Sequence, residues 1–237
     1  MHYSVLIVDD EKELSEYTAR YFNMSGVTAA YALDQQSALE FFKENTCSLI
    51  LLDINLGEDS GFELCQMIRE KMNVPIFFIS ARSAEDDMLL ALSIGGDDYI
   101  CKPYSQSVLL AKVKAALKRY EEASAKDPEA QATESAENLV RLGDATIDLS
   151  KAMVIRKGTK TPLKAMEFRL LVYMLNNRNR IIKKDEFFEN IWGTEFVGDV
   201  TLNVHIRHLR EKIEEDASNP SYIKTVWGSG FILEDNP

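Results

Sequence analysis

Short unbroken apolar runs alternate with amphipathic stretches over the first 120 positions of this 237-residue chain. Runs of four or five apolar residues have the length of strands that are buried on both faces, and the stretches between them repeat at a helical spacing. This alternation predicts an α/β domain, a doubly wound, flavodoxin-like five-stranded parallel sheet. The predicted strands are residues 5–8, 27–32, 49–52, 75–79 and 98–102, and the predicted helices are residues 11–24, 34–45, 60–71, 84–94 and 105–120.

The pattern changes after an acidic stretch at residues 121–138, which contains no apolar residue larger than alanine and is expected to be a linker. Beyond it, short polar–apolar stretches predict a small antiparallel sheet, and a Gly-Ser-Gly turn predicts a terminal hairpin. We therefore predict three parts: a domain at 1–120, the linker at 121–138, and an α+β domain at 139–237. The second domain has predicted strands at 140–142, 145–148 and 153–156, helices at 164–176, 184–192 and 199–214, and a hairpin at 222–233.

The net charge of −11 is unevenly distributed along the chain. Residues 1–120 carry 11 basic and 18 acidic residues, whereas residues 139–237 carry 15 basic and 14 acidic residues. A near-neutral second half with local clusters of Arg and Lys is compatible with a nucleic-acid module attached to an acidic regulator. No apolar run reaches the roughly 20 residues of a membrane span, and no signal peptide opens the chain, so we expect a cytoplasmic protein without a membrane partner.

Carboxylates follow two of the predicted strands. Asp9 and Asp10 end the first apolar run, and Asp53 ends the run at 49–52. Ligands of open parallel sheets bind beyond the carboxyl ends of the strands, so these three side chains are expected to converge. Two like charges 4 Å apart cost on the order of 4 kcal/mol at an effective dielectric constant near 20. A cation is therefore expected among them, and oxygen ligands with room for water suit Mg²⁺.

Two further strand ends complete this candidate site. Ser80 ends the strand at 75–79 and supplies a hydroxyl donor, while Lys102 follows the strand that begins at Asp98. A metal, a cationic side chain and a hydroxyl around one carboxylate are suited to phosphoryl transfer onto that carboxylate.

The set Asp9-Asp10, Asp53, Ser80 and Lys102-Pro103 resembles the receiver domain of bacterial two-component response regulators. The resemblance covers roughly residues 1–120. It implies that a partner sensor histidine kinase phosphorylates Asp53, with Mg²⁺ held by Asp10, Asp53 and the Asn55 backbone carbonyl and with Asp9 acting mostly through water. It also implies that Ser80 and Tyr99 form a switch pair, in which the hydroxyl moves to the phosphoryl group and the ring turns inward.

Three stretches of the second domain, 162–168, 204–210 and 224–231, resemble the winged helix-turn-helix output domain of the OmpR/PhoB subfamily. This resemblance covers residues 139–234. It implies a transcription regulator that binds promoter DNA at direct-repeat half-sites, with RNA polymerase as a further candidate partner, and that forms a homodimer on phosphorylation.

The third helix of that domain carries an apolar stripe that predicts its core face, with Val200 and Val204 on the opposite face. Two exposed valines would suit contacts to thymine methyl groups in a major groove, and polar neighbours would suit phosphates and base edges. The predicted DNA-binding residues are Val200, Thr201, Asn203, Val204, Arg207, His208, Arg210, Lys212 and Trp227. Relatives commonly carry Arg at the positions of Val200, His208 and Trp227, and we expect a shallower salt dependence here. The sequence leaves open whether Trp227 contacts DNA or packs against its own domain.

The same resemblance implies a receiver dimer held by charge pairs, for which Asp97, Asp98, Lys112 and Arg119 stand at matching positions. One further pair is replaced by Met88 and Val108. We expect these two residues, with Leu92, to form an apolar contact that depends little on salt.

Two other functions are compatible with part of this pattern. Haloacid-dehalogenase-type phosphatases also use an Asp at a strand end, but they need a second Asp where this chain has Asn55, which cannot shuttle a proton. A DNA-binding regulator that uses its receiver only for dimerisation, without phosphorylation, is the other alternative. The complete acidic set argues against it.

Overall fold

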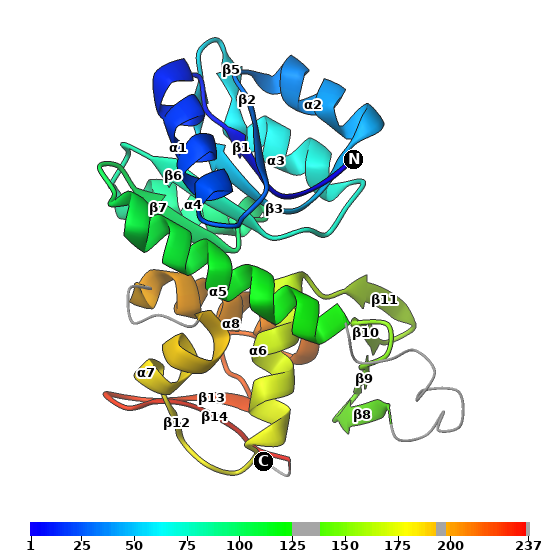
Figure 1. The fold of residues 1–237 in the computed structure, drawn as a ribbon. Coiled ribbons are helices and arrows are strands. Elements are labelled where there is room, and N and C mark those ends of the chain that lie inside the picture. The colour runs from blue at the N-terminus through cyan, green and yellow to red at the C-terminus, as the bar shows by residue number, and fades with distance from the viewer. Residues whose placement is uncertain (125–137, 193–197, 236–237) are drawn as a thin grey trace. The chain divides into compact units, whose positions relative to one another are not determined.

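The structure is a computed structural model that describes residues 1–124, 138–192 and 198–235 (Figure 1). The chain divides into two compact units, Met1–Glu121 and Glu122–Pro237, which are described separately. Most of the predicted linker, residues 125–137, lies outside the described residues. Within the described residues, no helix combines the length and the apolar character needed to cross a bilayer.

Unit 1 is built on a parallel five-stranded sheet with the strand order β2-β1-β3-β6-β7, which confirms the predicted fold class. The central position of β3 explains why its residues are apolar on both faces. The strands are β1 (His2–Val8), β2 (Ala29–Ala32), β3 (Thr46–Asp53), β6 (Ile76–Ser80) and β7 (Asp98–Cys101), and a small hairpin of β4 (Asn55–Leu56) and β5 (Asp59–Ser60) follows β3.

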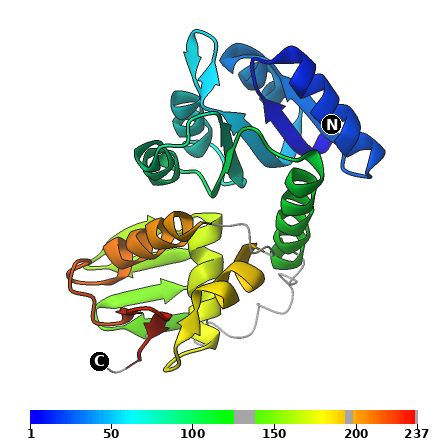
Figure 2. The ribbon, with the colours of Figure 1, turned by 90° about the vertical axis from the view of Figure 1, so that its left-hand side faces the viewer.

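Five helices cover the two faces of this sheet (Figures 1 and 2). Because side chains alternate along a strand, Val5 and Ile7 belong to one core with α1 and α5, while Leu6 and Val8 belong to another with α2, α3 and α4. The helices are α1 (Lys12–Met24), α2 (Gln35–Glu44), α3 (Gly61–Arg69), α4 (Glu85–Ile94) and α5 (Gln106–Ser124).

Unit 2 contains two antiparallel sheets and a helical layer around one core. The first sheet consists of β8 (Leu139–Leu142), β9 (Ala145–Asp148), β10 (Met153–Arg156) and β11 (Thr159–Pro162), and the second of β12 (Ile182–Lys183), β13 (Ile223–Val226) and β14 (Gly230–Leu233). The helical elements are α6 (Ala165–Asn176), α7 (Lys184–Phe187), the π-helical turn η2 (Phe188–Trp192) and α8 (Asp199–Ile213).

The sequence missed two strands and one irregularity in unit 2. β11 is mostly polar and exposed because it lies at a sheet edge, and β12 has only two residues, so neither produces a clear apolar pattern. The predicted helix at 184–192 is interrupted, because η2 follows α7 after one turn. The β13–β14 hairpin and the three helical regions otherwise confirm a winged-helix arrangement.

Candidate functional site

The acidic pocket of unit 1 lies where β1 and β3 end. The two strands are adjacent, with Val8 paired with Leu52, so the residues that follow them emerge side by side. One carboxylate oxygen from each of Asp9, Asp10 and Asp53 lies within 4.8 Å of the others. Asp9 and Asp53 are only 3% and 5% exposed, whereas Asp10 is exposed. The structure therefore brings together the three side chains that the sequence predicts to converge.

Lys102 reaches into this pocket from the end of β7. Its Nζ lies 2.8 Å from Asp9 Oδ2, 2.7 Å from Asp53 Oδ2 and 2.7 Å from Glu11 Oε1. Burial favours the neutral amine, but the bonds to the three carboxylates outweigh it and raise the pKa of Lys102. Burial raises the pKa of Asp9 as well, against the opposing effect of Lys102. Lys102 is therefore cationic throughout the physiological range.

Backbone groups fix the orientation of the buried carboxylates. The Asn55 N–H donates to Asp53 Oδ1 and the Glu11 N–H donates to Asp9 Oδ1, each at 3.0 Å. Gly61 allows the chain to pass close to β3, because a Cβ at this position would lie 1.9 Å from the Asp53 carbonyl oxygen. The loop that carries Asn55 is thus held against the end of the strand that carries Asp53.

The donor set of this pocket fits a hard divalent cation. Its ionisable side chains are Asp9, Asp10, Asp53 and Glu11 against one cation, Lys102, which leaves three uncompensated negative charges. All the candidate ligand atoms are oxygens, and Asp10 remains open to solvent. Oxygen ligands with room for water are typical of a Mg²⁺ site.

A second group of contacts joins the pocket to α4. Ser80, fully buried at the end of β6, accepts a hydrogen bond from the Arg82 N–H at 3.2 Å. The Tyr99 hydroxyl donates to the Arg82 carbonyl oxygen at 2.7 Å. The Arg82 guanidinium donates to Asn55 Oδ1 at 2.8 Å and pairs with Asp87 at 3.3 Å. Burial, above all, raises the pKa of Tyr99.

Sequence reasoning missed two members of this network, Glu11 and Arg82. Glu11 directly follows Asp9-Asp10, and Arg82 lies two residues after Ser80, so proximity to predicted site residues was the available signal. Both were indistinguishable from ordinary solvated charges at the start of a helix or loop, where such residues are common.

The candidate dimer residues differ from expectation. Asp98 pairs with Lys112 at 2.8 Å, and Asp97 pairs with Arg69 at 2.7 Å; all four side chains are nearly buried within one chain. In this structure Asp97, Asp98 and Lys112 are therefore already paired within one chain, and their pairing across an interface stays a prediction. The side chain of Arg119 lies outside the described residues.

One of the three residues predicted to form an apolar contact between receivers, Leu92 on α4, is buried. Leu92 is 1% exposed, because α4 packs on α3 and β7, so it is unavailable to a second chain. Met88 is half-buried and Val108 is 37% exposed, as an interface role requires. Leu89 and Leu90 are the exposed leucines of α4.

The predicted DNA-binding face of α8 is only partly exposed. Asn203 and Arg207 are exposed, and Arg207 pairs with Glu211 at 2.9 Å. Val200 is half-buried, and Thr201 and Val204 are only 4% and 5% exposed, so the expected pair of exposed valines is wrong. The physical reason is that α8 packs on α6, α7 and β10, which bury more of its circumference than a single stripe.

His208 and Lys212 contact a buried carboxylate within unit 2. His208 Nδ1 lies 3.5 Å from Glu167 Oε1, and Lys212 Nζ pairs with Glu167 Oε2 and donates to the Pro162 carbonyl at 3.0 Å. Glu167, on α6, is 1% exposed. Its burial favours the neutral acid, but its contacts with His208, Lys212 and the Lys164 N–H outweigh this and lower its pKa to about 2.

Arg210 joins α8 to the wing, the hairpin of β13 and β14. Its Nε donates to the Ile223 carbonyl at 2.8 Å, its terminal nitrogen donates to Thr225 Oγ1 at 2.9 Å, and its guanidinium lies 5.9 Å from the Phe231 ring centre. Arg210 is half-buried. The structure therefore gives it a role in holding the wing, which the predicted phosphate contact did not anticipate.

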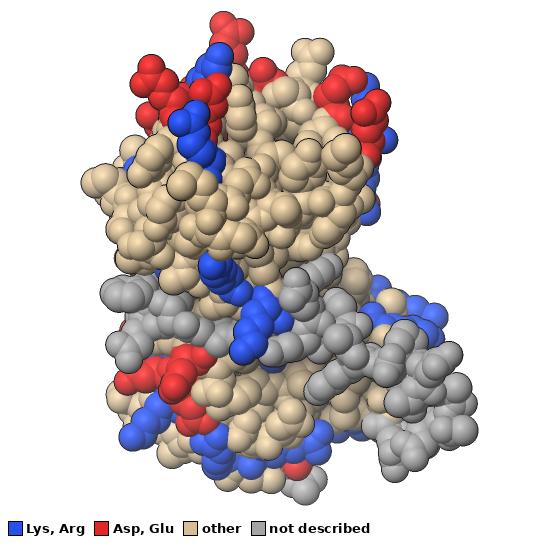
Figure 3. Space-filling view, in the orientation of Figure 1, with Lys and Arg blue, Asp and Glu red and all other residues tan. Residues whose placement is uncertain are grey.

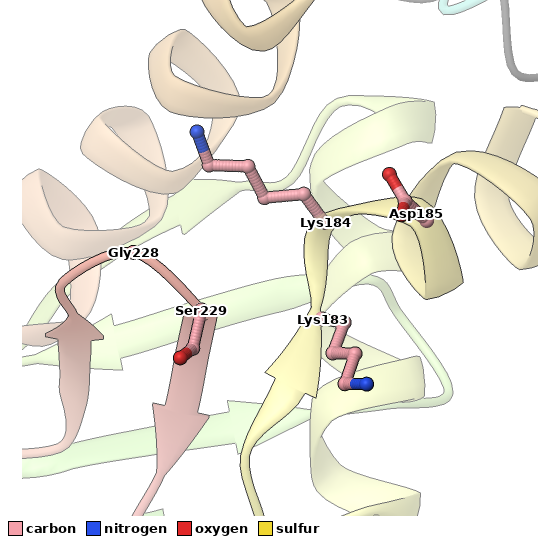
Figure 4. A pocket seen from close by; sticks show the side chains of 5 residues that line it. All are labelled: Lys183, Lys184, Asp185, Gly228 and Ser229. Carbon is pink, nitrogen blue, oxygen red and sulfur yellow. The ribbon is translucent and has the colours of Figure 1, made fainter.

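Trp227 and a small pocket lie at the tip of the wing. Trp227 is 92% exposed, so it does not pack against its own domain. A pocket of about 430 Å³ separates the wing turn from β12 and α7 (Figure 4). On the face shown in Figure 3, Lys and Arg side chains gather along the edge of unit 2 near β12, β13 and β14. The pocket is lined by Lys183, Lys184, Asp185, Gly228 and Ser229.

Comparisons with known proteins match both units. Residues 5–114 match the family model of the response regulator receiver domain, and residues 158–233 match that of the C-terminal domain of transcriptional regulatory proteins. The transcriptional regulatory protein YvrH of Bacillus subtilis is 39% identical over an alignment of 237 positions, which covers 99% of this chain and 96% of that protein. The sensory transduction protein RegX3 of Mycolicibacterium smegmatis is 36% identical over 232 residues, which are 98% of this chain and 99% of that protein.

A solved structure spans both units. The response regulator DrrB of Thermotoga maritima, described as an OmpR/PhoB homologue, is 27% identical, with a TM-score of 0.51. The match covers 99% of this chain and 100% of that one. The similarity therefore covers both units in the same order along the chain.

Proposed function

Because the chain belongs to the OmpR/PhoB family of two-component response regulators, which are transcription factors, we propose that phosphorylation of Asp53 controls its binding to promoter DNA. The observation that carries this proposal is the buried carboxylate of Asp53, placed 2.7 Å from Lys102 and beside Asp9 and Asp10. The proposed parts are a receiver at residues 1–120, a linker at 121–138 and a DNA-binding domain at 139–237. A protein that receives a phosphoryl group from the kinase and then binds promoter DNA would act in the cytoplasm.

The donor is a phosphohistidine of a partner sensor kinase. An oxygen of Asp53 forms a bond to phosphorus while the phosphorus–nitrogen bond breaks, and the imidazole leaves after taking up a proton. Asp10, Asp53 and the Asn55 carbonyl would hold Mg²⁺, with Asp9 acting through water. The ion supplies positive charge that stabilises the transferring phosphoryl oxygens. Lys102, whose Nζ lies 2.7 Å from Asp53 Oδ2, supplies a further positive charge beside the phosphoacceptor.

The phosphoryl group would change the surroundings of Ser80 and Tyr99. Ser80 is held by the Arg82 N–H, and Tyr99 is held by the Arg82 carbonyl, so both switch residues bind the same backbone segment. A phosphoryl oxygen that accepts a hydrogen bond from the Ser80 hydroxyl would draw this segment inward and release the Tyr99 ring. The segment leads directly into α4, whose Asp87 is paired with the Arg82 side chain.

Phosphorylation would then promote a homodimer that places two DNA-binding domains on direct-repeat half-sites. Met88 and Val108 remain candidates for the contact between chains. Asn203, Arg207 and Trp227 are the exposed candidates for contact with DNA, and RNA polymerase is a further candidate partner.

The test combines mass and affinity. The full chain is incubated with acetyl phosphate and Mg²⁺, and its mass gain and its affinity for DNA from its own promoter region are measured. Asp53→Asn should abolish the mass gain and the rise in affinity. Asp59→Asn, which changes an exposed carboxylate of the same loop, should preserve both.

The outcomes separate the alternatives. Equal phosphorylation of Asp53→Asn and the wild type would remove Asp53 from the phosphoacceptor role. A mass gain that leaves affinity unchanged would favour the phosphorylation-independent regulator, in which the receiver serves only for assembly.

A further inference from the structure

Lys102 has as many carboxylate partners in the acidic pocket as it has hydrogens to donate. An ammonium group carries three N–H donors. Three carboxylate oxygens surround Lys102 Nζ, with Asp53 Oδ2 at 2.7 Å, Asp9 Oδ2 at 2.8 Å and Glu11 Oε1 at 2.7 Å. A transferring phosphoryl group spreads negative charge over its oxygens, which a hydrogen bond from Lys102 would stabilise. Lys102 can donate to such an oxygen only after one of the three carboxylates gives way.

The three carboxylates differ in how easily Lys102 can release them. The side chains of Asp9 and Asp53 are 4% and 6% exposed, so either would be left buried and uncompensated without Lys102. The side chain of Glu11 is 60% exposed. Its carboxylate becomes hydrated once it is released, and an exposed ion pair contributes little. Glu11 is therefore the partner whose release costs least.

The backbone of Glu11 is fixed although its side chain faces solvent. Its N–H donates to Asp9 Oδ1 at 3.0 Å, and its carbonyl oxygen accepts from the Ser15 N–H at 2.9 Å. Glu11 is the N-cap residue of α1, a position whose side chain commonly accepts a hydrogen bond from the first turn. In the described part of the chain, the Glu11 side chain makes no such bond and contacts Lys102 instead. It can therefore leave Lys102 without removing a cap from α1.

We propose that Glu11 is a displaceable counter-ion of Lys102, which holds the ammonium group in the unphosphorylated receiver and yields its place to an oxygen of the incoming phosphoryl group. Glu11 is thus a positioning residue, because it acts through Lys102. The inference rests on the proposed phosphorylation of Asp53. Glu11 slows this phosphorylation, since the donor must break the Glu11–Lys102 contact and approach an additional negative charge. The same charge favours a divalent cation in the pocket.

The first test measures two properties of the full chain that should change in opposite directions. Glu11→Gln keeps the shape of the side chain and removes its charge. Acetyl phosphate transfers its phosphoryl group to an Asp53 oxygen and releases acetate. At saturating Mg²⁺ the initial rate of this mass gain should rise about fivefold, the equivalent of the roughly 1 kcal/mol that an exposed ion pair contributes at most. Calorimetric titration without a phosphoryl donor should show about threefold weaker Mg²⁺ binding, because the pocket loses one negative charge.

The second test separates the contact with Lys102 from the loss of a charge. Glu13→Gln is the matched control, because Glu13 is an exposed carboxylate in the first turn of α1, and both properties should change by less than about twofold. Glu11→Ala should be phosphorylated at least as fast as Glu11→Gln, with a melting temperature close to that of the wild type. The rate advantage of Glu11→Gln should shrink from low to high salt, since salt screens the exposed pair in the wild type.

Equal phosphorylation rates of Glu11→Gln and the wild type would overturn the inference and leave the Glu11–Lys102 contact as an ordinary surface ion pair. A slower rate combined with weaker Mg²⁺ binding would also overturn it, since Glu11 would then hold Lys102 in its productive position. Both results leave the proposed function intact, because the wild type is still phosphorylated. A wild type that gains no mass from acetyl phosphate would refute the proposed function together with this inference.

Discussion

Replacing Glu167 by glutamine should destabilise unit 2 because it breaks a buried ionic contact between α6 and α8. The carboxylate is 1% exposed and binds Lys212, His208 and the Lys164 N–H. In Glu167→Gln the amide cannot neutralise Lys212, whose side chain is 17% exposed. Removing one partner of a buried pair leaves the other charge uncompensated, and it is this residual charge that makes the substitution costly.

The pKa of Glu167 sets the magnitude. Its contacts lower the pKa from 4.5 to about 2, and each pKa unit corresponds to 1.36 kcal/mol, so the ionised carboxylate contributes about 3 kcal/mol to the free energy of unfolding. The pKa is lower in the folded state than in the unfolded state. The contribution is therefore complete above pH 4.5 and is lost as the pH falls from about 4.5 towards 2.

Urea unfolding followed by tryptophan fluorescence measures this effect selectively, because Trp192 and Trp227 both belong to unit 2. Glu167→Gln should lower the free energy of unfolding by about 3 kcal/mol at pH 7, and its difference from the wild type should shrink between pH 4.5 and 3. Glu211→Gln, which breaks an exposed pair on α8, is the matched control and should cost less than about 1 kcal/mol. Adding Lys212→Met to Glu167→Gln should recover part of the loss.

Equal stabilities of Glu167→Gln and Glu211→Gln at pH 7 would refute this reasoning. A difference from the wild type that stays constant down to pH 3 would do the same, since it would mean that the ionised carboxylate is not the stabilising species.

Three further predictions concern unit 1. Asp10→Asn should raise the Mg²⁺ concentration needed for half-maximal phosphorylation by acetyl phosphate at least about tenfold, because a charged ligand becomes neutral; an unchanged requirement would exclude Asp10 from the metal site. Gly61→Ala should slow this phosphorylation and lower the melting temperature seen by circular dichroism, since its Cβ would lie 1.9 Å from the Asp53 carbonyl; wild-type values would show that the loop can move away. Lys112→Met should destabilise unit 1 by about 3–5 kcal/mol by leaving Asp98 buried and unpaired, and Asp98→Asn in addition should restore much of it; a Lys112→Met protein of wild-type stability would mean that Asp98 finds another partner.

The receiver fold and its pocket could be read from the sequence because both depend on local signals. A strand buried on both faces must be a continuous apolar run, and the residue that ends it must lie at the edge of the sheet. Asp53 and Lys102 are therefore recognisable as residues at strand ends, and their occurrence together with Asp9, Asp10 and Ser80 marks the site. The family resemblance then assigns them roles that strand patterns alone cannot supply.

The failures involve partners that are distant in the sequence. The sequence does not show that Asp97 is bound by Arg69, 28 residues earlier. It likewise does not show that Lys212, predicted to contact DNA, is paired with Glu167. The predicted exposure of Val204 is wrong for a related reason. A helical projection shows which residues share a face, but it does not show how many neighbouring elements surround the helix. Long-range ion pairs and multi-sided packing have no periodic signature.

The side chains of β1 alternate between the two cores of unit 1, and this alternation affects how the protein tolerates mutation. Consecutive residues of β1, such as Leu6 and Ile7, belong to opposite sides of the sheet, and the same count fixes where Asp9 emerges. A conservative substitution in this strand disturbs one core, but a one-residue deletion exchanges the two sides and displaces the acidic pair by one position. A library of all single substitutions and deletions should therefore show permissive apolar exchanges in β1 alongside uniformly inactivating deletions, so that strand length is more constrained than side-chain identity.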